Sequence, residues 1–158
     1  GQQQLLLLVL STVIVGLATV AGIQAFDENR QQAAADALQQ KAMSIASDIK
    51  GLDGKPQQMG GLPDDFTQTS QSEVAQRLGF VQESDVAGSS NWAVPVSGAG
   101  ETSSATANCQ ISNLKSGEVH IECVGKDDYS NLTFYGVYDQ DGDPQLSVQA
   151  SDPSGTGT

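Results

Sequence analysis

The feature that most constrains this chain is an uncharged, apolar run from Leu5 to Phe26. It opens with six consecutive aliphatic residues, and the first charged side chain after it is Asp27. A helix of this length rises about 33 Å at about 1.5 Å per residue, which is enough to cross a hydrocarbon layer of about 30 Å. Because the helix is apolar on every side, we expect it to lie in lipid or inside a packed assembly of helices.

A cleaved secretory signal is the alternative interpretation of this run, because residues 21–25 resemble a signal-peptide cleavage site. Such a signal begins with Met and a basic stretch, whereas here Gly1 is followed by three glutamines and the first basic residue is Arg30. We therefore expect that a leader has already been removed and that the apolar run is the N-terminus of the mature protein.

Beyond Phe26 the pattern changes to that of an amphipathic helix. The apolar residues at spacings of three and four are Phe26, Ala34, Leu38, Ala42, Ile45, Ile49 and Leu52. No helix breaker separates this stretch from the apolar run. The sequence therefore predicts one continuous helix from about Gln3 to Lys50, about 70 Å long and capped by Gly51. Residues 1–26 would be its fully apolar half, and residues 27–50 an amphipathic half that packs on a globular domain.

The rest of the chain has the pattern of a small β domain, so the predicted fold class is α+β. Residues 51–78 read as a Gly- and Pro-rich connection with a short helix capped by Thr69 or Ser70, and residues 79–150 as an antiparallel β head. The predicted strands are 79–82, 92–96, 107–113, 118–124, 132–138 and 145–149. Pro95 favours an edge position for its strand, and residues 151–158 favour a loose tail.

The two cysteines lie on facing strands of a predicted hairpin. If the hairpin is centred on Ser116, then Asn113 faces Val119 and Cys109 faces Cys123, and directly opposed residues of antiparallel strands are within disulfide reach. A disulfide indicates an oxidising compartment outside the cytosol. Two buried free thiols are the alternative interpretation.

Three other groups of polar residues are candidate sites. Asp139, Asp141 and Asp143 resemble the start of a calcium loop, but the distal Glu of such a loop is missing and Asp-Gly is a common hairpin turn. On the predicted strand 118–124, the alternation places polar side chains on one face. One interpretation of this face is a cation site, and the other is an ordinary solvent-exposed surface. The residues of that face are Glu118, His120 and Glu122. Finally, Asn131-Leu132-Thr133 fits the acceptor pattern for N-glycosylation.

The charge and the motif content of the chain exclude some classes of function. The chain has 158 residues and a net charge of −12, so it has no basic surface with which to neutralise nucleic-acid phosphates. Residues 1–50 carry a net charge of −1 and residues 51–158 carry −11. No motif for a nucleophile, a phosphate loop or a cofactor is present, and the single histidine lacks a catalytic context, so we expect neither enzymatic activity nor a cofactor.

Together these residues resemble a type IV pilin or a pilin-like filament subunit. The resemblance rests on the apolar N-terminal run, the amphipathic continuation to about residue 50, the Gly/Pro-rich connection and the disulfide-bearing β domain. It implies a subunit that waits in the cytoplasmic membrane after a prepilin peptidase removes its leader, and that assembly machinery then builds into an extracellular filament of identical copies. Its implied roles are adhesion and motility at the cell surface. The residues expected in the filament core are Leu5, Leu6, Leu8, Val9, Val13, Leu17, Val20, Ile23 and Phe26.

The start of the chain departs from the best-known bacterial pilins, which commonly begin with Phe and carry Glu at the fifth mature position. Here Gly1 stands first and Leu5 fifth, or Leu6 if cleavage follows Gly1, and the preceding glutamines are more similar to archaeal or divergent bacterial pilins. Assembly guided by a Glu and a neighbouring N-terminal amine is therefore not expected. The alternative function is a monomeric extracellular binding domain held by a single membrane-spanning helix.

Overall fold

A computed structural model describes residues 1–82, 92–96, 101–102 and 105–153 of the chain. The chain forms two compact units, residues 1–33 and 34–158, and helix α1 (Gln2–Asp53) begins in the first and ends in the second. The predicted end of the helix at Lys50 is wrong by three residues, since α1 continues through Gly51 to Asp53. The backbone N–H of Gly54 still donates to Lys50 O at 3.2 Å, so the turn that leaves the helix forms only after Gly51.

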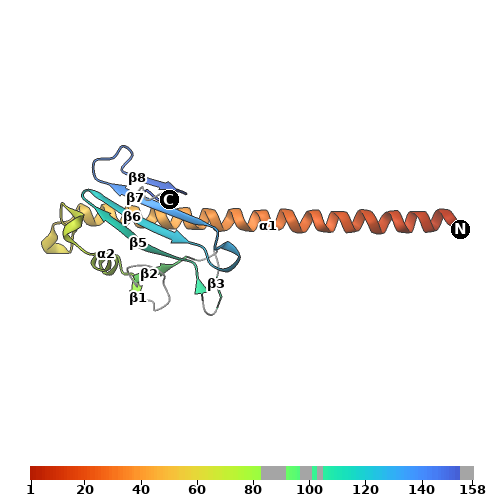
Figure 1. Cartoon of the computed structure of the whole chain (residues 1–158), viewed down its shortest axis with the longest axis horizontal. Coiled ribbons are helices and arrows are strands. Elements are labelled where there is room, and N and C mark those ends of the chain that lie inside the picture. Colours follow the sequence, from red (N-terminus) through yellow and green to blue (C-terminus); the bar gives the residue numbers. More distant parts are fainter. Residues whose placement is uncertain (83–91, 97–100, 103–104, 154–158) are drawn as a thin grey trace. The chain divides into compact units, whose positions relative to one another are not determined.

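The second unit contains a six-stranded antiparallel sheet of order β1-β2-β5-β6-β7-β8 and a separate β3–β4 pair (Figure 1). This arrangement confirms the α+β class and the antiparallel head. The strands are β1 (Val81–Gln82), β2 (Trp92–Pro95), β3 (Glu101–Thr102), β4 (Ala105–Thr106), β5 (Asn108–Lys115), β6 (Glu118–Val124), β7 (Thr133–Asp139) and β8 (Leu146–Gln149). The six predicted strands match the six of the main sheet, whereas the short β3–β4 pair was not predicted.

The β5–β6 hairpin has the predicted register only in its half remote from the turn. Cys109 faces Cys123 as predicted, but nearer the turn Asn113 faces His120, one residue away from the predicted register. An irregularity in β5 just before Asn113 shifts the pairing, as a β-bulge does. The turn itself contains Gly117 with a φ of 79°, a conformation that glycine adopts without steric cost.

Cys109 and Cys123 form the predicted disulfide, with their Cα atoms 4.0 Å apart. Both side chains are fully buried beneath α1. A bond that closes a loop of this length contributes about 3 kcal/mol in the chain-entropy model. The alternative of two buried free thiols is therefore wrong. The disulfide supports the prediction of an oxidising compartment.

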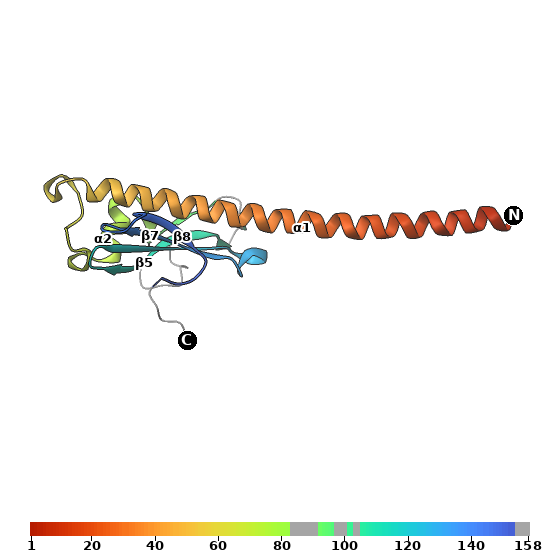
Figure 2. The same ribbon diagram turned by 90° about the horizontal axis from the view of Figure 1, so that it is seen from above.

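The half of α1 that belongs to the second unit lies along one face of the sheet (Figure 2). Its buried side chains fall at helical spacing, which confirms the predicted amphipathic face from Ala34 to Ile49; Phe26, predicted on the same face, is 64% exposed, and Leu52 is partly buried. The buried side chains are Ala34, Leu38, Ala42, Ile45, Ala46 and Ile49. Gly136 in β7 allows the close approach, because a Cβ atom there would lie only 2.9 Å from the backbone oxygen of Ala42.

The connection between α1 and the sheet contains three short helices. They are η1 (Gln57–Met59), η2 (Phe66–Gln68) and α2 (Gln71–Arg77). Ser70 is the N-cap of α2, and a reciprocal capping box joins it to Glu73, as the sequence allowed. Leu62 and Phe66 extend the core formed by the helix and the sheet.

β2 lies between β1 and β5 in the sheet, so the edge position predicted from Pro95 is wrong for the strand as a whole. The proline is accommodated because β1 pairs only with Trp92 and Ala93, while Pro95 pairs with β5 alone among the described strands. Of the predicted tail 151–158, residues 154–158 lie outside the described residues.

A partly buried network that the sequence did not suggest fastens the end of α1 to β7. The Tyr138 hydroxyl donates to Asp53 Oδ2 at 2.6 Å, and the Gln140 side-chain amide donates to Asp53 Oδ1 at 2.9 Å. Tyr138 is only 3% exposed and lies against Phe66, with ring centroids 6.1 Å apart. Burial, followed by the hydrogen bond to Asp53, raises the pKa of the Tyr138 hydroxyl, so it remains a donor throughout the physiological range.

We expect Tyr138→Phe to lower the free energy of unfolding of the head by about 1–2 kcal/mol, because the substitution removes one hydrogen bond to a carboxylate. Urea titration of the full chain in detergent would measure the change. Tyr135→Phe is the matched control, since Tyr135 is half-buried on the opposite sheet face and is expected to change stability little. Equal stability of the Tyr138→Phe variant and the parent would show that the network contributes nothing.

Candidate functional site: the apolar surface of helix α1

The apolar run forms a long helical surface that nothing in its own unit covers. Every residue from Gly1 to Arg30 is exposed. The large side chains are between 53% and 69% exposed, and this includes all nine residues predicted for the filament core. Leu7, Leu10, Ile14 and Val15 are exposed to the same degree, so the apolar surface surrounds the helix and is not restricted to one stripe. We call residues 5–26 of α1 the apolar rod.

The apolar rod also satisfies its few hydroxyl groups internally. Ser11, Thr12 and Thr19 each donate a hydrogen bond to a backbone oxygen three or four residues earlier, all at 2.8 Å. An unsatisfied hydroxyl in an apolar environment costs several kcal/mol, and these bonds remove that cost. The rod is therefore suited to lipid or to a dry helix bundle.

The length of the rod matches that of a membrane span. By length and composition, α1 is the one helix among the described residues that could cross a membrane, and the apolar window that qualifies it is wholly unburied. A core helix of a soluble domain would instead be mostly buried.

An aromatic–cation pair marks the end of the rod. The Arg30 guanidinium lies 6.0 Å from the centroid of the Phe26 ring, one helical turn away. Asp27 and Glu28 between them are the first acidic residues of the chain. Aromatic and basic side chains are characteristic of the boundary between hydrocarbon and water, so the polar surface begins here. This contact was not predicted; the i, i+4 spacing of Phe26 and Arg30 was the sequence signal available for it.

The acidic turn that also resembles a calcium loop is a hairpin turn between β7 and β8, the alternative that the Asp-Gly pair favours. The backbone N–H of Asp141 donates to Asp139 Oδ1 at 3.0 Å, and Gly142 N donates to Asp139 O at 3.3 Å. Asp141 and Asp143 are exposed. Among the residues that the structure describes, no three His, Cys, Asp or Glu side chains are grouped as a metal site would require.

The prediction of an exposed polar face on β6 is wrong for His120, which is only 1% exposed. Its Nε2 lies 3.1 Å from Glu118 Oε2, and since a carboxylate only accepts, Nε2–H is the donor. Asn108 and Gln110 on the neighbouring strand are also buried, which shows that this sheet face is covered although its composition is polar. The alternation along β6 correctly predicted which side chains share the polar face. It could not indicate that other parts of the protein cover this face.

Glu122 shares that face, and its pKa is raised by burial and, secondarily, by the charge of Asp152. Because this pKa is higher in the folded state than in the unfolded chain, folding disfavours the ionised carboxylate. The protonated side chain therefore favours folding at acidic pH, and this stabilisation is lost as pH rises above the ordinary Glu value of 4.5.

We expect Glu122→Gln to stabilise the head slightly at neutral pH, by under about 1 kcal/mol because the side chain is only half-buried. The gain should disappear below about pH 4, where Glu122 in the parent is protonated. Unfolding of the full chain in detergent at the two pH values would measure the difference. A gain that is identical at both pH values would mean that the titration of Glu122 is not its cause.

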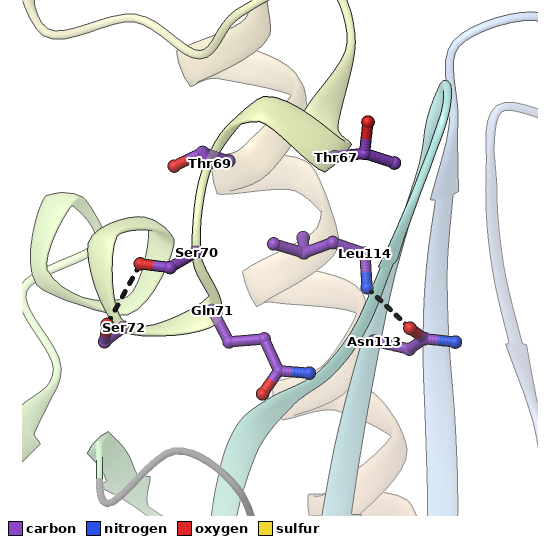
Figure 3. Close-up of a pocket in the computed structure, with 7 residues that line it drawn as sticks. All are labelled: Thr67, Thr69, Ser70, Gln71, Ser72, Asn113 and Leu114. Atoms are coloured by element: carbon purple, nitrogen blue, oxygen red, sulfur yellow. Dashed lines mark hydrogen bonds between the residues drawn. The ribbon is translucent and has the colours of Figure 1, made fainter.

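An open depression of about 390 Å³ lies in the second unit between α2 and β5 (Figure 3). It is lined by Thr67, Thr69, Ser70, Gln71, Ser72, Asn113 and Leu114, none of which titrates in the physiological range. Its polar groups already serve the local structure. Ser70 caps α2, Gln71 donates to Ser112 O at 2.7 Å, and Asn113 Oδ1 accepts from Leu114 N. The depression therefore has the chemistry of a helix cap and contains no acid, base or nucleophilic pair.

Comparison with known proteins finds no match to this chain among protein families, curated proteins or solved structures. A long apolar N-terminal helix whose second half packs on an antiparallel sheet with a disulfide is a pilin-like architecture. The apolar helix and the disulfide also indicate a membrane-associated or extracellular protein.

Proposed function

We propose that this chain is the structural subunit of an extracellular, type IV pilus-like filament of identical copies, held together by the apolar rod. The observation that carries the proposal is the exposure of every large side chain from Leu5 to Phe26. We propose a structural role without catalysis. The pilin resemblance further implies a prepilin peptidase, assembly machinery, a membrane-held precursor, and adhesion or motility as the filament's use.

The free energy of the rod in water supports assembly. At about 25 cal/mol per Å², exposing on the order of 1,500 Å² of apolar surface costs roughly 35–40 kcal/mol. In a membrane the lipid covers this surface, and hydrophobicity then gives little drive for helices to associate. Once the rod leaves the membrane, other copies of the same rod are the available apolar cover.

The geometry of such packing favours a fibre. Each rod is apolar around its whole circumference, so one copy offers different faces to different neighbours. Contacts between unlike faces of identical subunits are heterologous, and unless the rotation closes a ring they build an open helical polymer. The heads, which carry a net charge of −11 over residues 51–158, would form the hydrated outer surface.

The second candidate is a monomeric domain anchored by a single membrane-spanning helix, which the length of the rod alone also favours. Mechanical shearing of cells separates the two proposals. A filament subunit should appear in the sheared extracellular fraction, and negative-stain electron microscopy should show fibres that antibodies against the head decorate. Recovery of the chain only in the membrane fraction would favour the anchored monomer.

The charge of the heads predicts a salt requirement for the filament. Crowded acidic heads repel one another, and the Debye length falls from about 30 Å at 0.01 M salt to about 3 Å at 1 M. We expect sheared filaments to dissociate or fragment in dilute buffer and to be stable at high salt, measured as the pelletable fraction across a sodium chloride titration. A pelletable fraction that does not change with salt would contradict this expectation.

A further inference from the structure

One sequence motif begins with a side chain that serves neither the fold nor the proposed filament. Asn131-Leu132-Thr133 is the single Asn-X-Ser/Thr tripeptide of the chain. The structure places Asn131 in the turn between η3 (Asp127–Tyr129) and β7, where the residue is exposed. Its carboxamide makes no hydrogen bond within the described part of the chain. The nitrogen that an N-linked glycan would require is therefore accessible and not engaged in holding the fold.

The turn is held together by atoms other than those of the Asn131 side chain. Leu132 N donates to Tyr129 O at 2.9 Å, Gly125 N donates to Leu132 O at 3.0 Å, and Ser130 N donates to Asp127 O at 3.2 Å. Leu132 packs against the core, so the residue next to the acceptor fixes the turn. A bulky group on Asn131 would project from a turn whose backbone bonds do not depend on it.

We propose that Asn131 carries an asparagine-linked glycan, attached on the outer side of the membrane. The donor is a saccharide linked through phosphate to a membrane lipid. Asn131 Nδ2 attacks the anomeric carbon of that saccharide, the new bond is carbon–nitrogen, and the carbon–oxygen bond to the lipid phosphate breaks. The lipid phosphate leaves with the electron pair, and Nδ2 loses one proton to the transferase. The Cys109–Cys123 disulfide places the head in the kind of compartment where this transfer occurs.

The positions of the basic residues make the site easy to test by mass spectrometry. Within residues 1–158, trypsin cuts after Lys126 and at no later residue, so residues 127–158, with Asn131 among them, stay together in one peptide. In protein from the organism that makes the chain, we expect this peptide to be heavier than its sequence mass by whole sugar residues. Electron-transfer fragmentation should place the increment on Asn131. An unmodified peptide in all of the material would overturn the proposal.

Three variants of the full chain in that organism distinguish the acceptor from other attachment sites. Asn131→Gln and Thr133→Ala should remove the increment, whereas Thr133→Ser keeps the acceptor pattern and should retain it. An increment that survives Asn131→Gln would mean attachment to a serine or threonine and would overturn the proposal. Because the test reads the mass of a head peptide, it is independent of whether the chain forms filaments.

Discussion

A lysine in the middle of the apolar rod, Val13→Lys, is expected to abolish filaments completely. Val13 is 53% exposed in the isolated helix and would be surrounded by other rods in the assembly. Burying one ammonium group away from water costs several kcal/mol, and the cost recurs in every subunit of a polymer. Electron microscopy of sheared material from cells carrying the variant would measure the loss, and Leu17→Lys should give the same result.

The control for this prediction is Gln39→Lys, which adds the same charge at an exposed position of α1 in the second unit. It should leave filaments normal. Formation of the Cys109–Cys123 disulfide and resistance of the head to protease should be retained in all three variants, because the substituted side chains lie outside the head core. Membrane fractionation then shows whether Val13→Lys is still inserted. Normal filaments from the Val13→Lys variant would contradict the proposal that the rod is the assembly element.

The apolar rod and its continuation could be predicted from the sequence because both depend on local patterns. An uncharged run is visible without any knowledge of tertiary structure, and the spacing of Ala34, Leu38 and Ala42 identifies the buried helix face directly. The disulfide was equally accessible, since clean alternation on 118–123 and a short turn bring Cys123 opposite its partner.

Features that depend on contacts between distant segments could not be predicted. His120 alternates with apolar residues as a solvent-facing side chain would, yet the covering of its sheet face buries it. The β5 irregularity before Asn113 has no sequence signal of its own and shifts every pair between it and the turn. Likewise, Asp53 and Tyr138 are 85 positions apart, and only the packed structure shows that they are hydrogen-bonded.

For the candidate site, the sequence predicted both the correct segment and a helix that is apolar on every side. The nine predicted core residues were an incomplete list, because Leu7, Leu10 and Ile14 are exposed to the same degree. The distribution matters for the proposed assembly, because a single stripe would favour a closed dimer or small bundle, while a surface on all sides favours contacts with several neighbours.

The second large effect is expected inside the head, at the close approach of α1 to the sheet at Gly136. In Gly136→Ala the new Cβ would lie 2.9 Å from Ala42 O and 3.3 Å from Ala42 Cβ, so the helix must move away from β7. Overpacking of this kind typically costs about 1–3 kcal/mol. Gly136→Val adds two more methyl groups at the same contact, and we expect it to prevent the head from folding.

Gly51→Ala is the matched control, because it makes the same chemical change in α1 where nothing lies within 4 Å of the added Cβ. It should raise stability by about 0.5–1 kcal/mol through the better helix propensity of alanine. Urea unfolding of both variants as full chains in detergent would therefore give changes of opposite sign. If Gly136→Ala instead matched or exceeded the parent in stability, the close contact between Ala42 and β7 would not be what holds the helix on the sheet.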